Sequence, residues 1–216
     1  MTKVIRIDIH QPDPVLIQEA ASILREGGVV AYPTETFYAL GADGLLEKAI
    51  QRLFEIKGRN FSNPIALIGG DDKDLSLITD DIPDAARPLM TAFWPGPLTL
   101  IFQASRLVQP RLTAGTGKIG IRISSHAIAR GLATALRHPI TATSANISGN
   151  PECTTAQEVS DRIGPLVDLI IDGGQTRGGK GSTMLDVTTF PPVVLREGAI
   201  AESHITEILG SIEFRS

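Results

Sequence analysis

The chain has 216 residues, of which 42% are hydrophobic and 20% charged, a composition typical of a soluble globular protein. Its net charge of −4 argues against a protein generally coated with nucleic acid, and its single cysteine, Cys153, excludes an intramolecular disulfide. No apolar run approaches the ~20 residues that span a bilayer, and no signal peptide opens the chain. We therefore expect a cytoplasmic protein without membrane contact.

Alternating polarity predicts strands, and an apolar period of 3.6 residues predicts helices. Gly28 and Gly58 end the first two helices, the capping box from Thr155 to Glu158 opens a later one, and Ser203 is expected to cap the last. In chain order the predictions are a strand at 3–9, a helix at 14–25, a strand at 29–32, a helix at 45–56, a strand at 65–68, short helices at 72–78 and 83–93, strands at 98–104 and 117–124, a helix at 126–136, a strand at 140–143, a helix at 155–163, strands at 167–171, 183–187 and 193–196, and a final helix.

Strands and helices alternate without a repeat, a linker or a low-complexity tract. This order predicts one α/β domain, residues 1–216, with a twisted open sheet of about seven strands flanked by helices. Some strands near the C-terminus follow each other without a helix between them, so we expect the sheet to be mixed.

Polar and cationic side chains gather where predicted strands begin and end. The stretch YPTETFYALGADG, residues 32–44, places Thr34, Glu35 and Thr36 directly after an apolar strand. Because ligands bind at the carboxyl edge of the strands in an open α/β sheet, these side chains are expected to meet others there. The others are Lys57, Arg59, Arg122, Ser144, Asn146, Ser182 and Arg196. Hydroxyls, an amide and several cations together predict a site for a polyphosphate and a small polar molecule.

The charge is unevenly spread along the chain. Residues 85–151 contain no Asp or Glu, yet they carry Arg87, Arg106, Arg111, Lys118, Arg122, Arg130 and Arg137. Solvated helix faces are one interpretation. The other is an anion site for phosphates, a carboxylate or a nucleic-acid backbone.

Three other kinds of site are less well supported. The segment GQTRGGKG, residues 174–181, nearly fits a phosphate loop, but Gly181 replaces the needed hydroxyl and a predicted strand replaces the needed helix. A glycine-rich loop that closes over a ligand fits better. Four histidines and one cysteine lack metal-ligand spacing, so no protein metal site is expected. Ser144 has no obvious neighbouring base, and a simple Ser-Asn turn remains an equal alternative for it.

Seven segments, in this order, resemble the YrdC-type threonylcarbamoyl-AMP synthases. They are YPTETFYALGADG, KGR with NPIALI, WPGPLTLIF, GKIGIRISSH, TATSANISG, GST and LREGAI, and they extend over about residues 29–200. The resemblance implies a single-domain, YrdC/RibB-like fold. Ala39 and Asn60 depart from it, because the family usually has Gly and Pro there. A sister branch also tends to have this Ala but generally lacks KGR and SAN, which favours the synthase branch.

The resemblance implies that L-threonine, bicarbonate and ATP, with Mg²⁺ accompanying the ATP, give threonylcarbamoyl-adenylate and pyrophosphate. The product would pass to a threonylcarbamoyl transferase complex for the N6-threonylcarbamoyl modification of adenosine 37 in tRNA. Matching positions imply that the threonine-binding residues are Thr34, Thr36, Arg122, Ala142 and Ser182. The implied ATP-binding residues are Lys57, Arg59, Asn63, Lys118, Ser144, Asn146 and Arg196. Lys57 and Arg59 are also the implied catalytic residues, and we expect both to be exposed at a helix end.

Two alternatives remain open. A non-enzymatic module that contacts tRNA or another RNA would use the acid-free window as its footprint and would bind with steep salt dependence. A carbamoyl-adenylate enzyme that acts on carbamoyl phosphate, as in related domains of hydrogenase-maturation proteins, would not require threonine.

Overall fold

The computed structural model describes residues 2–58 and 63–214, with Phe214 described by its backbone alone. Every predicted element has a counterpart among the helices and strands of this part of the chain. In chain order these are β1 (Lys3–Arg6), α1 (Pro14–Arg25), β2 (Val30–Pro33), β3 (Tyr38–Gly41), α2 (Glu47–Lys57), β4 (Leu67–Gly69), the 3₁₀ helix η1 (Asp72–Asp74), α3 (Leu75–Ile78), α4 (Ala86–Phe93), β5 (Leu98–Gln103), β6 (Lys118–Ile123), α5 (Ala127–Leu136), β7 (Ile140–Thr141), β8 (Thr143–Ser144), α6 (Ala156–Ile163), the 3₁₀ helix η2 (Gly164–Leu166), β9 (Leu169–Asp172), β10 (Thr183–Asp186), β11 (Val193–Arg196), α7 (Glu202–Leu209) and β12 (Glu213–Phe214).

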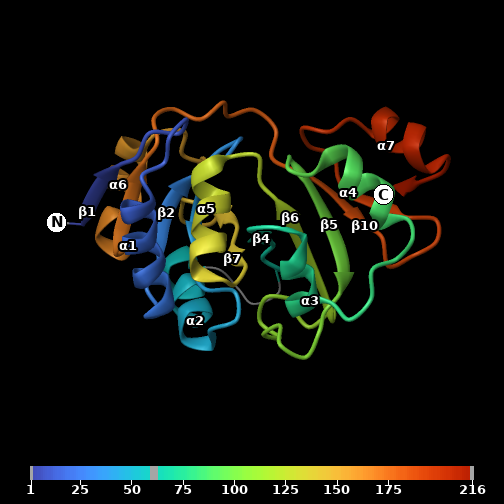
Figure 1. Cartoon of the computed structure of the whole chain (residues 1–216), viewed down its shortest axis with the longest axis horizontal. Helices are drawn as coiled ribbons and strands as arrows, with labels where there is room; N and C mark the ends of the chain where they lie inside the picture. Colours follow the sequence, from blue (N-terminus) through green and yellow to red (C-terminus); the bar gives the residue numbers. More distant parts are fainter. Residues whose placement is uncertain (1, 59–62, 215–216) are drawn as a thin grey trace.

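The strands form two sheets, which lie next to each other in Figure 1. Sheet A has the order β1-β9-β2-β3-β8, and sheet B has the order β12-β11-β10-β5-β6-β4-β7. Each contains parallel and antiparallel pairs, such as β1 with β9 and β2 with β3 in sheet A. The prediction of a mixed α/β fold is therefore confirmed, but the expected single sheet of about seven strands is in fact two sheets.

The chain crosses from one sheet to the other within a few residues. β7 pairs with β4 in sheet B, β8 pairs with β3 in sheet A, and only Ala142 separates the two strands. The predicted strand at 140–143 is thus split between the sheets. The short sequence Ile-Thr-Ala-Thr gives no local signal for such a division, because only the distant pairing partners define it.

Local sequence signals explain where several helices begin and end. Asp13 accepts a hydrogen bond from the backbone of Val15 at the start of α1, and Gly58 ends α2 with a φ of 54°. The capping box of α6, with Thr155 and Glu158, is present as predicted. Ser203 is not the cap of α7, because this helix already begins at Glu202, and no side chain caps it.

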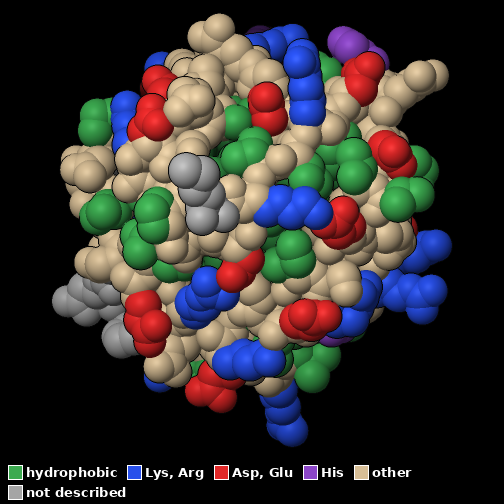
Figure 2. Space-filling model, turned by 90° about the vertical axis from the view of Figure 1, so that its left-hand side faces the viewer, with side chains coloured by type: hydrophobic (Ala, Val, Ile, Leu, Met, Phe, Trp, Pro, Cys, Tyr) green, Lys and Arg blue, Asp and Glu red, His purple; other side chains and the backbone are tan. Residues whose placement is uncertain are grey.

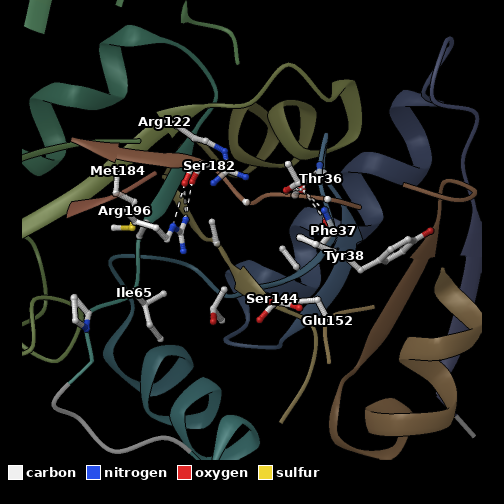
Figure 3. Close-up of a pocket in the computed structure, with 18 residues that line it drawn as sticks. Thr36, Phe37, Tyr38, Ile65, Arg122, Ser144, Glu152, Ser182, Met184 and Arg196 are labelled. Atoms are coloured by element: carbon white, nitrogen blue, oxygen red, sulfur yellow. Dashed lines mark hydrogen bonds between the residues drawn. The ribbon is translucent and has the colours of Figure 1, made fainter. Parts of the chain in front are cut away.

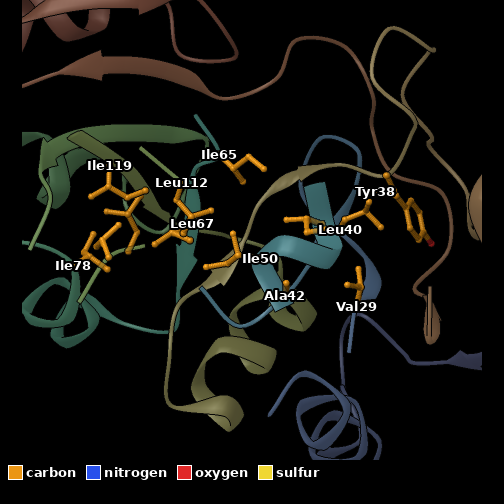
Figure 4. Packing of buried hydrophobic residues seen from close by; sticks show 14 of the residues in the cluster. Val29, Tyr38, Leu40, Ala42, Ile50, Ile65, Leu67, Ile78, Leu112 and Ile119 are labelled. Atoms are coloured by element: carbon orange, nitrogen blue, oxygen red, sulfur yellow. The ribbon is translucent and has the colours of Figure 1, made fainter. Parts of the chain in front are cut away.

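Both faces of the β2–β3 hairpin are buried. Neighbouring residues of a strand point to opposite faces, so each strand contributes side chains to two hydrophobic clusters. Ala31, Tyr38 and Leu40 belong to one hydrophobic cluster, which also contains residues of α2 and sheet B (Figure 4). Val30 and Tyr32 belong to the other cluster, together with the apolar faces of α1 and α5. The hairpin is therefore held from both sides, and its polar turn projects from a fixed base.

The face of the molecule drawn in Figure 2 carries Lys and Arg side chains interspersed with Asp and Glu, and no single sign of charge dominates it. Ion pairs of the described residues, such as that of Arg52 with Asp168 at 2.5 Å, also bring the two signs of charge together. Within the described ranges, no helix is long and apolar enough to cross a membrane.

Candidate active site between the two sheets

A cavity of about 480 Å³ lies where the two sheets meet. The β2–β3 hairpin and the β7–β8 crossing line one part of it, and β6, β10 and β11 line another (Figure 3). Residues just before β4 and the glycine-rich loop before β10 complete its wall. Segments that are far apart in the sequence thus converge on one space, as the polar strand ends predicted.

The turn of the β2–β3 hairpin presents Thr34 and Thr36 to the cavity. The Thr34 hydroxyl donates to the carbonyl of Phe37 at 2.7 Å and accepts from the backbone N–H of Thr36 at 3.2 Å. Its hydrogen bonds therefore serve mainly to shape the turn. The Thr36 hydroxyl, 3.3 Å from that of Thr34, is the one better placed to meet a ligand.

Arg122 lines the cavity from β6 and forms an ion pair with Glu35. Its Nε atom donates to Oε1 of Glu35 at 3.0 Å, and the Ser124 hydroxyl donates to Oε2 of the same carboxylate. Burial opposes the charge of Glu35, but Arg122 and Ser124 outweigh it and lower the pKa of the carboxyl below its ordinary value. The distant acid that Arg122 lacks in its own sequence neighbourhood is therefore Glu35.

A second arginine faces the same cavity from the end of β11. Arg196 donates from Nη2 to the carbonyl of Ser182 at 2.8 Å and to its hydroxyl at 3.2 Å (Figure 3). The Ser182 hydroxyl also lies 2.8 Å from that of Thr99. Burial, followed by the nearby charge of Arg122, lowers the pKa of Arg196. Two guanidinium groups that disfavour each other in this way suit an anionic ligand between them.

The sequence predicts that Lys57 is exposed at its helix end, but the structure shows it only 2% exposed. Its Nζ atom donates to Oδ1 of Asn146 at 2.7 Å and to the carbonyl of Ser144 at 2.8 Å. The predicted Lys57, Ser144 and Asn146 are therefore brought together, with Ser144 lining the cavity. Arg59 and Asn60 lie outside the described residues.

The other predicted residues divide into two groups. Ala142 lines the cavity, although its own N–H already donates to the carbonyl of Ala66 at 2.8 Å. Lys118 and Asn63 are not among the residues that line it. Lys118 instead pairs with Asp186 at 2.8 Å, at the end of β6 opposite to Arg122. The structure thus gives no geometric support to the assignment of Lys118 to ATP.

The glycine-rich loop between β9 and β10 bridges the two sheets beside the cavity. Tyr38 donates its hydroxyl to the carbonyl of Gly174 at 2.7 Å, and the N–H of Gly178 donates to the carbonyl of Thr36 at 2.7 Å. Gly174 and Gly178 have φ angles of 82° and 66°, which residues with a side chain rarely adopt. The loop therefore needs its glycines for its path and is tied to the hairpin at two points.

No group of three or more metal-binding side chains occurs in the part of the chain that the structure describes. Among these residues, Glu152 is the one carboxylate that lines the cavity. A divalent cation in this space would therefore need most of its oxygen ligands from a bound nucleotide and water, in the manner of Mg²⁺ with ATP.

Sequence reasoning missed Glu35, Ser124 and Thr99 as partners of the predicted site residues. Glu35 lies in the segment 32–44, whose polar residues are predicted to belong to the site, but its partner Arg122 is 87 positions away. A carboxylate between two threonines does not reveal that partner without the pairing of the strands. The acid-free stretch around Arg122 was the available signal that its counter-ion had to come from elsewhere.

Comparison with known proteins gives a family match and close structural neighbours. The family model Sua5_yciO_yrdC, described as "Telomere recombination", matches residues 22–198. The chain is 42% identical to the threonylcarbamoyl-AMP synthase of Pyrococcus abyssi over 196 residues, which cover 91% of this chain and 58% of that relative. The chain therefore spans less than two thirds of the length of this curated relative.

Two solved structures extend the comparison. The crystal structure of P. abyssi Sua5 complexed with L-threonine has a TM-score of 0.95 and 40% identity, covering 99% of this chain and 63% of that one. The structure of E. coli YciO has a TM-score of 0.83 and 33% identity, covering 93% of this chain and 98% of that one. The arrangement of the two sheets is thus shared with both proteins.

Proposed function

We propose, since this chain belongs to the Sua5/YciO/YrdC family, that it makes threonylcarbamoyl-AMP and pyrophosphate from L-threonine, bicarbonate and ATP. The observation that carries the proposal is the pair of arginines, Arg122 and Arg196, that face one hydroxyl-lined cavity between the sheets. The relative solved with L-threonine has the same fold at a TM-score of 0.95 and supports an amino acid as one of the substrates.

The reaction fits a site that lacks a protein nucleophile. The threonine amine combines with bicarbonate to form a carbamate and water. A carbamate oxygen then attacks the α-phosphorus of ATP, the bond from that phosphorus to pyrophosphate breaks, and threonylcarbamoyl-AMP is left. Such a transfer depends on holding the two reactants in line and on neutralising phosphate charge, rather than on covalent catalysis.

The residues of the cavity divide between the two substrates in this proposal. Arg122 holds the threonine carboxylate, and Thr36 and Ser182 offer hydroxyls to the rest of the amino acid. Arg196, which donates to the carbonyl of Ser182, stabilises negative charge on the phosphates. Lys57 acts indirectly, because its buried ammonium group holds in place the turn that presents Ser144 to the cavity.

The wider assignments are also proposals. Mg²⁺ would arrive with ATP, since the described residues offer no carboxylate cage for it. The adenylate would be consumed by a threonylcarbamoyl transferase complex that modifies tRNA. Direct contact with tRNA or another RNA is the alternative role, and the mixed charges of the face in Figure 2 do not favour a large basic footprint there.

Release of pyrophosphate from ATP tests the proposal. The complete mixture should release pyrophosphate, and omission of either threonine or bicarbonate should reduce the rate at least tenfold. Serine lacks the methyl group of threonine, and loss of one methyl contact in a fitted pocket costs ~1–3 kcal/mol, so serine should be a much poorer substrate. Turnover that continues at the full rate without any amino acid would contradict the proposal.

A further inference from the structure

Glu35 forms an ion pair with Arg122, the buried arginine that lines the cavity, but Glu35 is not itself one of the lining residues. Its carboxylate receives Nε of Arg122 on one oxygen and the Ser124 hydroxyl on the other. The side chains of Arg122 and Glu35 are 7% and 12% exposed, so the pair is almost enclosed. Glu35 is held by β6 and by the segment that follows it, while its backbone belongs to the hairpin turn.

The ion pair separates two hollows of the surface. Arg122 lines the cavity between the sheets and not the second hollow, whereas Glu35 lines the second hollow, of about 470 Å³, and not the first cavity. Thr36 contributes to both. Glu35 therefore contacts the guanidinium group through Nε without being one of the residues that a ligand of the first cavity would meet.

A guanidinium group can offer two parallel N–H donors from its side, through Nε and one terminal nitrogen, or from its end, through both terminal nitrogens. Glu35 occupies Nε of Arg122 at 3.0 Å. Among the described residues, no hydrogen bond joins the terminal nitrogens of Arg122 to another side chain or carbonyl. The end of the group is thus the part left for a ligand.

From this geometry we infer that Glu35 is a positioning residue, which holds Arg122 so that an amino-acid carboxylate docks end-on against its two terminal nitrogens. The inference rests on the proposed function and adds the way in which the amino acid is oriented. Ser124 is the second anchor, because it fixes the oxygen of Glu35 that does not touch Arg122. Glu35 also keeps the buried arginine paired when the cavity is empty, a state that would otherwise leave a costly isolated charge.

Binding of L-threonine and of L-threoninamide, which lacks the carboxylate, isolates the contact in question. Calorimetric titration gives the affinity ratio of the two ligands for wild-type protein and for the variants Glu35→Ala, Glu35→Gln and Ser124→Ala. We expect the ratio to fall at least tenfold in Glu35→Ala and about threefold in Ser124→Ala. It should change less than threefold in Glu35→Gln, because the amide oxygen can still accept from Nε. Affinity for ATP should stay within twofold throughout.

Glu152→Gln is the matched control. Glu152 also lines the first cavity with a carboxylate, but it forms no hydrogen bond with Arg122. This variant should keep the wild-type ratio of threonine to threoninamide affinity. An unchanged ratio in Glu35→Ala, or a loss of ATP affinity as large as the loss for threonine, would overturn the inference.

A spectroscopic measurement on wild-type protein removes the dependence on the folding of any variant. Nitrogen-15 spectra of the arginine side chains report Nε and the terminal nitrogens of Arg122 separately. Added threonine should shift the terminal nitrogens and leave Nε almost unmoved, whereas displacement of Glu35 would shift Nε and contradict end-on docking. If wild-type protein neither binds threonine nor releases pyrophosphate with it, the proposed function fails instead, so the two failures are distinguishable.

Discussion

Nζ of Lys57 lies 2.7 Å from Oδ1 of Asn146, at the end of a helix where a lysine side chain would usually extend into water. The same ammonium donates to the carbonyl of Ser144, and the Ser144 hydroxyl donates to Oδ1 of Asn146 at 2.7 Å. The lysine of the KGR segment and the SAN segment therefore form one buried polar cluster, which joins α2 to the turn after β8.

The first prediction follows from this burial. Lys57→Ala removes a buried donor and leaves the carbonyl of Ser144 without it, so the free energy of unfolding should fall by about 1–3 kcal/mol. Lys48→Ala is the control, because Lys48 is exposed on the same helix and should change stability by less than ~0.5 kcal/mol. Denaturant unfolding measures both. Equal stability of the two variants would show that the cluster contributes nothing to the fold.

A second prediction concerns Arg122→Lys and complements the Glu35 variants. Lysine keeps the positive charge, but its single ammonium cannot offer two parallel donors to a carboxylate while a third reaches Glu35. A hydrogen bond to a charged group is worth ~1.5–3 kcal/mol, so threonine affinity should fall roughly 10- to 100-fold, while ATP affinity changes less than about threefold.

Calorimetric titration with each ligand checks this prediction. Arg106→Lys is the control, because Arg106 is exposed in the loop after β5 and does not line the cavity. Its affinity for both ligands should match the wild-type values. If Arg122→Lys binds threonine normally, Arg122 serves the phosphates or the fold, and another residue must anchor the carboxylate.

Much of the fold could be predicted because its signals are local. The helix at Pro14–Arg25 has its proline at the first position, its cap at Asp13 and a glycine pair after its end, and its predicted bounds are those observed. The strand Val193–Arg196 was likewise predicted with its observed ends. Each of these signals lies within a few residues of the element that it defines, so no knowledge of distant partners was needed.

The division into two sheets could not be predicted, because it depends on pairing between distant segments. The sequence predicts no strand between the strand at 29–32 and the helix at 45–56, yet Tyr38–Gly41 pairs with β2 and β8 as a strand. Burial of Lys57 has the same origin, since its partner Asn146 is 89 positions away. From the local sequence alone, a lysine at the end of a helix is predicted to be exposed, because the residues that bury it are distant in the sequence.

A third prediction concerns acid stability and the ion pair outside the cavity. Burial alone would raise the pKa of Asp186, but hydrogen bonds from Lys118 and Thr188 outweigh it and lower the pKa below its ordinary 3.8. A carboxyl with a lowered pKa stabilises the folded state above its ordinary value, and this stability is lost as pH falls through the lowered pKa. Asp186→Asn should therefore cost about 1–3 kcal/mol at pH 7 and progressively less below pH ~4.

Denaturant unfolding of wild-type protein and Asp186→Asn across this pH range gives the difference directly. Asp161→Asn is the control, because Asp161 is exposed on α6 and accepts one hydrogen bond from the neighbouring Gln157. Its effect should be small at every pH. A cost of Asp186→Asn that stays constant down to pH ~2 would mean that shape, and not charge, accounts for the contribution of Asp186.

The last prediction concerns the glycine-rich loop and two buried tyrosines that offer a matched pair. Tyr38 donates to the carbonyl of Gly174 and accepts from the N–H of Gly173 at 3.3 Å, whereas Tyr32 of β2 donates to the carbonyl of Thr141 of β7 at 2.8 Å. Burial raises the pKa of Tyr38 to about 12, so its phenol stays protonated and keeps donating at neutral pH. Tyr32→Phe should lose ~1 kcal/mol of stability with its one hydrogen bond, and Tyr38→Phe, which loses two, should lose about 1–2 kcal/mol. Only Tyr38→Phe should speed hydrogen exchange of the amides at residues 173–181 and raise the substrate concentration needed for half-maximal turnover, because it alone removes one of the two points at which the loop is tied to the hairpin. Equal exchange of these amides in the two variants would show that Tyr38 does not hold the loop over the cavity.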